Sequence, residues 1–193
     1  MDRNSLDFNE LWKHYPFSER ADQGTENPGG TVAEINTLVG GYVKLNDFEN
    51  MCAVRMSRAL NYAGWPVPSK YRHKLMKTFS VGGADKKWYM FRVRELRNYL
   101  MRELGKPDVA KPSEAGSTQV RLDFMMRRGI IIFDVPEWKN ATGHVTLWKD
   151  TKAADREYFA KAVKVELWKI PSKPQSNTVK NEDGTYTTTS SAL

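Results

Sequence analysis

The amino-acid sequence predicts an α+β domain in which helices come first and an antiparallel sheet comes last. Two patterns carry this prediction. Apolar residues recur at the helical spacing of about 3.6 before Gly129, and β-branched or alternating runs replace them after it. The length of 193 residues suits one domain with a sizeable core. We therefore expect one domain over residues 1–171 and a polar, flexible tail over residues 172–193.

The N-terminal part predicts two short helices with a loop between them. Apolar residues from Leu6 to Tyr15 indicate an amphipathic helix, which Pro16 stops. Residues 21–30 are rich in turn-forming residues and indicate a loop. Residues 31–38 indicate a second helix that ends at Gly40-Gly41. This glycine pair either only stops the helix or also borders an active-site cleft, because glycine permits close backbone approach.

The next helix is predicted to begin at Cys52, the only cysteine of the chain, and to end at Gly64. Three residues that favour helix caps precede it: Asn46, Asp47 and Asn50. An apolar stripe then follows at helical spacing: Met56, Ala59, Leu60 and Ala63. At a helix N-terminus, unpaired N–H groups and the positive end of the helix dipole favour a thiolate. Cys52 is therefore either a nucleophile or an inert buried cysteine.

The middle of the chain predicts one long helix between irregular segments. Residues 69–88 are basic and irregular. Apolar residues over 91–104 indicate a helix whose end is marked by Gly105. Residues 106–116 indicate a loop, and residues 117–127 a further helix.

Three segments after Gly129 predict the strands of the sheet. Residues 130–135 form a β-branched run typical of a buried strand. Residues 143–149 and 163–168 alternate with a period of two. Residues 184–187 in the tail are a candidate edge strand.

A cysteine at a helix start and a histidine on a strand form the layout that a thiol hydrolase needs. Of the three histidines, His14 and His73 resemble ordinary surface or packing residues. His144 differs because Gly143 before it clears space and strand alternation holds its ring on one face. We therefore expect His144 to be the base, with a structural histidine as the alternative.

The charge and hydropathy of the chain narrow the classes of partner. A net charge of +7 suits nucleic acid, a membrane surface, an acidic cell-wall polymer or an acidic inhibitor. The basic residues are spread along the chain, which disfavours a nucleic-acid-binding domain. No run approaches the roughly 18 apolar residues of a membrane span, so membrane insertion is not expected. The N-terminus also lacks the apolar region of a signal peptide.

The sequence contains none of the common metal-binding or cofactor-binding motifs. One cysteine and three dispersed histidines offer no C-x-x-C or H-E-x-x-H spacing. Neither a Walker loop nor a dinucleotide fingerprint is present. We expect no metal, no cofactor and, with a single cysteine, no internal disulfide.

Five segments carry a resemblance to a known family: residues 40–43, 50–61, 89–93, 104–107 and 143–148. In this order they resemble the type VI secretion amidase effectors of the fourth family, and the similarity runs from about Leu6 to Ile170. Its most specific parts are the block N-x-C-A-x-R-M-S-x-A-L-N around Cys52 and the strand G-H-V-T-L-W at His144. Together these two motifs are hard to produce by chance.

The resemblance implies a papain-like antibacterial toxin, a cysteine amidase that cleaves peptidoglycan stem peptides between D-glutamate and meso-diaminopimelate. Such effectors are made in the cytoplasm without a signal peptide and reach the periplasm of a rival cell through a type VI secretion delivery component. A cognate immunity protein blocks the active cleft in the producing cell. The basic charge would then suit the anionic peptidoglycan.

The resemblance also implies roles for single residues. Cys52 matches the family nucleophile and His144 the base, and Asp155 aligns best with the third, acidic member. Asp150, which is nearer the strand end, and Glu157 stay open as alternatives. The Cys52 backbone N–H would meet the oxyanion, with Asn50 as a candidate second donor or, alternatively, a helix cap.

Three other functions are compatible with parts of the sequence. A housekeeping papain-like cell-wall hydrolase would share the chemistry, but such proteins usually carry an export signal and wall-binding modules. A basic nucleic-acid-binding domain would use only the charge. A non-catalytic adaptor with the same fold is disfavoured because Cys52 and His144 are both present.

Overall fold

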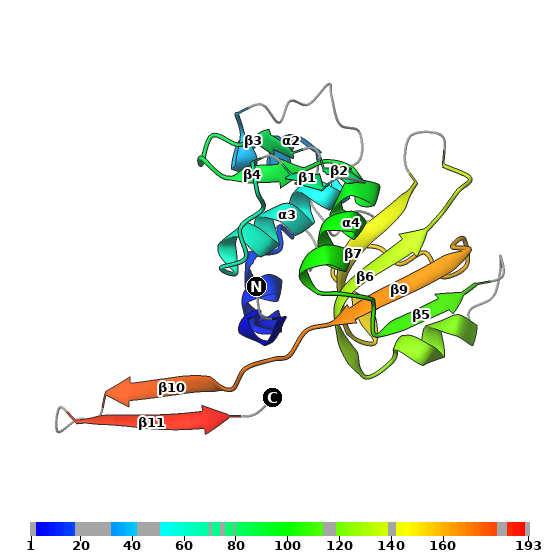
Figure 1. Ribbon diagram of the computed structural model, residues 1–193. Coiled ribbons are helices and arrows are strands. Elements are labelled where there is room, and N and C mark those ends of the chain that lie inside the picture. The colour runs from blue at the N-terminus through cyan, green and yellow to red at the C-terminus, as the bar shows by residue number, and fades with distance from the viewer. Residues whose placement is uncertain are drawn as a thin grey trace.

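The computed structural model confirms the predicted α+β architecture, with helices first and an antiparallel sheet last (Figure 1). It describes residues 3–17, 32–41, 51–69, 71–73, 76–78, 80–113, 119–138, 142–180 and 185–191. The main sheet has five strands, in the spatial order β5 (Val109–Pro112), β9 (Lys164–Lys169), β6 (Arg127–Asp134), β7 (Gly143–Asp150) and β8 (Lys152–Ala153). All of its strand pairs are antiparallel.

The four predicted N-terminal and central helices are present. They are α1 (Phe8–His14), α2 (Val32–Val39), α3 (Cys52–Tyr62) and α4 (Val93–Glu103), and a 3-10 turn, η1 (Arg3–Ser5), precedes them. The Asp7 carboxylate caps α1 by accepting from the Asn9 N–H at 3.0 Å. After α2, Gly40 and Gly41 have positive φ angles of 59° and 68°, so the glycine pair ends that helix.

The main core lies between α3 and the sheet (Figure 1). Met56, Ala59 and Leu60 on α3 are fully buried, and Ala63 just after the helix is partly buried against the same cluster, so the predicted apolar stripe faces the core. They share one cluster with the following residues of α4 and the sheet: Leu96, Leu100, Ile130, Ile132, Val145 and Leu147. Each of the leucine, isoleucine, valine and methionine side chains stabilises the fold by about 1.5–3 kcal/mol through its burial. This packing fixes the position of the helix that Cys52 begins.

A second cluster involves alternate residues of the same strands. Ile131 and Phe133 of β6 pack with Trp148 of β7 and with Phe159. The Trp148 indole N–H donates to the Phe124 carbonyl at 2.7 Å, which satisfies its polar atom inside the cluster. Because both sets of side chains are buried, β7 is held firmly along its length.

Residues 69–88, expected to be irregular, contain short strands instead, and that prediction was wrong. The structure shows one hairpin of β1 (Tyr71–His73) with β2 (Met76–Thr78) and another of β3 (Ser80–Gly82) with β4 (Trp88–Met90). Asp85 stabilises the second turn by accepting from the Lys87 N–H at 3.1 Å and from the Tyr62 hydroxyl at 2.9 Å. Such side-chain contacts do not recur at helical or strand spacing, so the sequence pattern did not reveal these hairpins.

Two further expectations need correction. The loop expected at 106–116 contains the edge strand β5, which pairs with β9 from Val109↔Leu167 to Pro112↔Lys164. The helix expected at 117–127 is, in its described part, the 3-10 helix η3 (Gln119–Phe124), and β6 already begins at Arg127. Residues after Asp150 also contribute the short strand β8.

The chain after β9 first returns to the N-terminal helix. The Phe8 N–H donates to the Pro171 carbonyl at 2.8 Å, and the Lys173 N–H to the Asp7 carboxylate at 3.1 Å. A separate hairpin follows, β10 (Gln175–Lys180) with β11 (Tyr186–Ser191), rich in β-branched threonine. The strand at Tyr186 therefore belongs to this hairpin and not to the edge of the main sheet (Figure 1). The domain boundary at residue 171 and the flexibility of the tail stay predictions.

None of the helices in the described part of the chain has the length and hydropathy that a membrane crossing requires.

Candidate active site

Cys52 is the first residue of α3 and is 2% exposed. Met51 precedes it at the N-cap position and makes no side-chain capping hydrogen bond. The predicted capping residues, and with them the candidate oxyanion donor Asn50, lie outside the described residues. The structure thus places the sulfur at the positive end of an eleven-residue helix.

His144 lies on β7 and is the side chain that meets Cys52. Its Nε2 is 2.9 Å from the Asp155 Oδ1, so Nδ1 remains for the hydrogen bond between the ring and the Cys52 side chain. The ring stacks on Phe133 at 6.5 Å between centroids and meets the Tyr158 ring edge-on at 5.0 Å. His144 is 7% exposed, and its imidazole is held by two aromatic rings and by its two polar partners, Asp155 and Cys52.

Gly143 is needed for the strand that carries His144. A Cβ at this position would come 2.1 Å from the Phe133 carbonyl oxygen, which is backbone and cannot rotate away. The glycine therefore allows β7 to approach β6 closely at the point where the site is built. The sequence predicted that Gly143 clears space before His144, and the structure shows that this space is occupied by the backbone of Phe133.

Asp155 reaches the site because the chain after β8 continues alongside β7. The Ala154 N–H donates to the Leu147 carbonyl at 2.8 Å, which directs the following residue back toward His144. The Asp155 side chain is 1% exposed. Its Oδ1 accepts from the Arg156 backbone N–H at 2.6 Å and faces the imidazole.

Tyr15, which directly follows α1, and Arg55 on α3 contact the other oxygen of this carboxylate. The Tyr15 hydroxyl donates to Asp155 Oδ2 at 2.8 Å, and Arg55 Nη1 lies 3.6 Å from the same atom. Tyr15 and Arg55 are 2% and 7% exposed, so both contacts are shielded from solvent. The sequence had not singled out either residue as part of a site.

The pKa shifts of the site follow from these contacts. Burial raises the pKa of Asp155, but the His144 charge and the hydrogen bonds from His144 and Tyr15 lower it to well below its usual range. Burial lowers the pKa of His144, but the Asp155 charge and the bonds to Asp155 and Cys52 raise it to about 10. At neutral pH the pair is therefore an imidazolium beside a carboxylate. Burial, then the Asp155 charge, raises the pKa of Tyr15, which keeps its proton and stays a donor.

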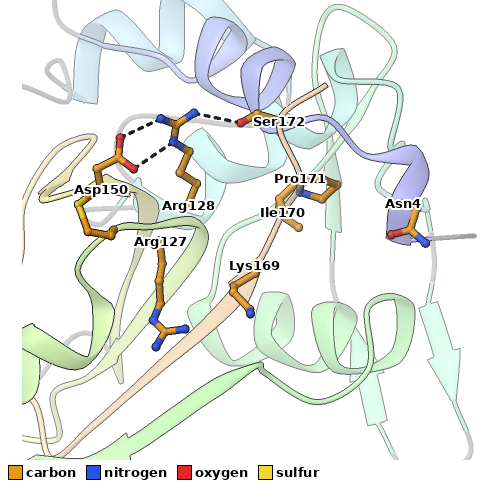
Figure 2. Close-up of a pocket in the computed structure, with 9 residues that line it drawn as sticks. Asn4, Arg127, Arg128, Asp150, Lys169, Ile170, Pro171 and Ser172 are labelled. Atoms are coloured by element: carbon orange, nitrogen blue, oxygen red, sulfur yellow. Dashed lines mark hydrogen bonds and ion pairs between the residues drawn. The ribbon is translucent and has the colours of Figure 1, made fainter. Parts of the chain in front are cut away.

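Asp150, the alternative acidic residue, lies at the other end of β7 and is engaged there. Its two oxygens accept from Arg128 Nε and Nη2, each at 3.1 Å. Figure 2 shows this pair beside Ser172, at a cleft of about 650 Å³ that Arg127 and Lys169 also line. The structure thus brings Asp155, not Asp150, into contact with His144.

The other candidates also lie in separate contacts. The Glu157 carboxylate accepts from Arg121 Nε at 3.2 Å. His14 Nε2 is 3.4 Å from Glu10 on α1, and its half-buried ring lies against Tyr62. The side chain of His73 lies outside what the structure describes. Within the described residues, no group of three histidine, cysteine, aspartate or glutamate side chains could hold a metal ion.

Chemically, the arrangement joins a thiol at a helix N-terminus, an imidazole in contact with it and a carboxylate that orients the imidazole. A signal for Arg55 was present, because it follows Cys52 at i+3 and therefore shares its helix face. Tyr15 left no signal, since its contact with Asp155 joins residues 140 positions apart.

The α+β fold, with a cysteine helix packed on an antiparallel sheet that carries the histidine, is that of papain-like proteins. The chain belongs to the family of type VI secretion system amidase effector protein 4 (Tae4), whose family model matches residues 48–168. A search of curated proteins finds no match.

Solved structures of this family are similar to the chain over most of its length. A chain of the Tae4–Tai4 effector–immunity complex from Salmonella Typhimurium is 31% identical, with a TM-score of 0.66, and the match covers 86% of this chain and 99% of that chain. For the Tae4–Tai4 complex from Enterobacter cloacae the identity is 32% and the TM-score 0.68, over 86% and 98%. The effector Tae4 from Enterobacter cloacae is also 32% identical, with a TM-score of 0.66, over 86% and 96%.

Proposed function

We propose that this chain is an antibacterial cysteine amidase that hydrolyses the D-glutamyl–meso-diaminopimelate bond of peptidoglycan stem peptides. Its membership of an amidase effector family supports the reaction class. The observation that carries the assignment of residues is the continuous contact from Cys52 through His144 to Asp155. In this proposal Cys52 is the nucleophile, His144 the general base and acid, and Asp155 the residue that orients the imidazole.

The first half of the reaction forms an acyl-enzyme. With the proton on His144, the Cys52 sulfur attacks the scissile carbonyl carbon as a thiolate. A tetrahedral intermediate forms, and the imidazolium donates its proton to the departing amine as the C–N bond breaks. The high pKa of His144, about 10, supports this starting state because it keeps the imidazole protonated at neutral pH.

The second half releases the acyl group. The imidazole, now neutral, takes a proton from water, which attacks the thioester carbonyl and forms a carboxylic acid. The sulfur leaves as a thiolate and His144 is again the imidazolium. Asp155 stabilises this charge in both halves and fixes the ring orientation through Nε2.

The negative oxygen of each tetrahedral intermediate needs donors. The Cys52 backbone N–H at the start of α3 is the first, because the positive end of the helix dipole lies there and favours a negative oxygen. Asn50 is proposed as the second donor from the sequence alone. Loss of one such donor typically lowers kcat by about 10²–10³-fold.

The proposal includes delivery and a partner. The related structures from Salmonella Typhimurium and Enterobacter cloacae are effector–immunity complexes, which supports a cognate immunity protein for this chain. A net charge of +7 suits both an acidic inhibitor and anionic peptidoglycan. We infer export by a type VI secretion system and action in the periplasm of the target cell.

Digestion of purified Gram-negative peptidoglycan tests the function directly. The wild-type chain should release fragments whose masses identify cleavage between D-glutamate and meso-diaminopimelate. Cys52→Ala should lower this release by at least about 10³-fold while the protein stays folded. Undiminished release by Cys52→Ala would reject the nucleophile, and fragments cut at another bond would reject the stated specificity.

A further inference from the structure

We propose that Tyr15 and Arg55 are positioning residues that fix the orientation of the Asp155 carboxylate and, through it, that of the His144 imidazole. This inference rests on the proposed function of Cys52, His144 and Asp155. It adds two residues from the helical part of the fold to a reaction carried out at the edge of the sheet.

The two oxygens of Asp155 have different partners, and this division carries the proposal. Oδ1 faces the imidazole at 2.9 Å and accepts from the Arg156 backbone N–H at 2.6 Å. Oδ2 faces the helices, with the Tyr15 hydroxyl at 2.8 Å and Arg55 Nη1 at 3.6 Å. A carboxylate bound at one oxygen alone can rotate about its last bond. Partners on both oxygens hold Oδ1 toward Nε2.

Burial makes these partners necessary. The Asp155 side chain is 1% exposed, and a buried carboxylate without compensating donors is strongly disfavoured. His144 supplies one positive charge and Arg55 a second, on the side away from the imidazole. Arg55 thereby compensates the carboxylate without competing for Oδ1.

Packing alone does not explain the Tyr15 hydroxyl. The ring of Tyr15 belongs to the apolar cluster between α1, α3 and the sheet, and phenylalanine would fill nearly the same volume. The hydroxyl instead aims at a carboxylate 140 positions away in the chain. Because Tyr15 directly follows α1, this bond joins the N-terminal helix to the site.

A double-mutant cycle tests whether Tyr15 acts through Asp155. With a soluble muropeptide substrate, Tyr15→Phe should lower kcat about tenfold and leave KM within twofold, since the carboxylate is misplaced and not lost. In the Asp155→Ala background the same change should lower the residual rate less than twofold. A purely structural role would lower the rate by the same factor in both backgrounds. That result, or an unchanged kcat for Tyr15→Phe, would overturn the proposal for Tyr15.

The role of Arg55 is tested by removing or keeping the positive charge at position 55. Arg55→Met should lower kcat by about 10–100-fold, and Arg55→Lys, which keeps a cation near Oδ2, should recover at least part of this loss. Arg128→Met is the matched control, because it removes an arginine–aspartate pair at the other end of β7. Equal kcat losses for Arg55→Lys and Arg55→Met, both folded, would reject the electrostatic role. If Arg55→Met does not fold, the Lys variant and the Tyr15 cycle still decide.

The tests separate this inference from the proposed function. Undiminished peptidoglycan cleavage by Cys52→Ala rejects the proposed function itself. An inactive Cys52→Ala combined with a fully active Tyr15→Phe rejects only the positioning role.

Discussion

An arginine–aspartate pair lies beside each end of β7, and the two pairs differ in their burial and in their other partners. At the His144 end, Arg55 and Asp155 lie 3.6 Å apart, with side chains 9% and 1% exposed. At the far end, Arg128 and Asp150 form two contacts of 3.1 Å, with side chains 26% and 33% exposed. The pair with the shorter contacts, Arg128 with Asp150, is thus the more exposed one; Figure 2 shows this pair alone.

Contact distance alone therefore does not identify the functional pair. Both oxygens of Asp150 accept from the same guanidinium, which is a self-contained bidentate arrangement. Asp155 gives one oxygen to Arg55 and Tyr15 and the other to a titratable imidazole. A buried carboxylate shared between a fixed cation and a base can tune that base, whereas an exposed bidentate pair mainly fastens two strands.

The largest expected difference between the two ends is in catalysis. Asp155→Asn should lower kcat by about 10²–10⁴-fold, because the amide no longer stabilises the imidazolium or fixes its orientation. Asp150→Asn should change kcat less than about twofold, since it is not in contact with His144. Both variants are compared by the rate of muropeptide release at saturating substrate. The opposite ranking would reassign the acidic residue to Asp150.

Stability should also distinguish the two pairs. Arg55→Met leaves a buried carboxylate without one of its cations and should lower the free energy of unfolding by about 3–5 kcal/mol. Arg128→Met breaks a partly exposed pair and should lower it by under about 1 kcal/mol. Urea unfolding followed by circular dichroism measures both. Similar losses of unfolding free energy for the two variants would mean that burial does not determine how much each pair stabilises the fold.

Each end of the sheet also contains a glycine at a close backbone approach. A Cβ on Gly143 would come 2.1 Å from the Phe133 oxygen, and one on Gly129 would come 1.9 Å from the Trp168 oxygen. Alanine at either position should force the strands apart and lower the melting temperature by a similar amount. Only Gly143→Ala displaces His144, so it alone should lower kcat, by about tenfold, in the folded protein. Equal kcat losses would show that the sheet transmits strain over its whole length.

The same comparison explains what the sequence could and could not predict. Cys52 at a helix start and His144 on an alternating strand follow from local periodicity, and both elements formed as expected. The choice of Asp155 over Asp150 depended on the family resemblance, because both lie within a few residues of the strand end. The register that directs residue 155 back along β7 comes from a backbone hydrogen bond between Ala154 and Leu147, which no residue pattern encodes.

The contacts that sequence reasoning missed are those made by long-range packing or by turn side chains. Tyr15 meets Asp155 only after α1, α3 and the sheet have packed together. The β3–β4 turn depends on Asp85, which binds the Lys87 N–H and the Tyr62 hydroxyl. Such contacts have no period, so helical or strand templates cannot find them.

The smallest expected difference between the Arg55–Asp155 and Arg128–Asp150 pairs is in the pH dependence of stability. Because the folded pKa of His144, about 10, lies above its ordinary value of about 6.5, its stabilising contribution is complete below about pH 6.5 and is lost as the pH rises toward 10. The pKa of Asp155 is lowered, so its contribution is complete above about pH 4 and is lost in acid. The melting-temperature advantage of the wild type over Asp155→Asn should therefore peak between about pH 4 and 6.5 and decline by a few degrees toward pH 10.

The Asp150→Asn variant supplies the control for this decline. The Arg128–Asp150 pair contains no histidine, so its loss should give a difference that stays level on the alkaline side. Thermal melts of the three proteins between pH 5 and 10 measure both differences. An alkaline decline that is equal for Asp150→Asn would assign the effect to the whole fold, and no decline for Asp155→Asn would mean that the imidazolium does not depend on Asp155. A decline confined to Asp155→Asn would tie the titration of His144 to the buried carboxylate that Tyr15 and Arg55 hold.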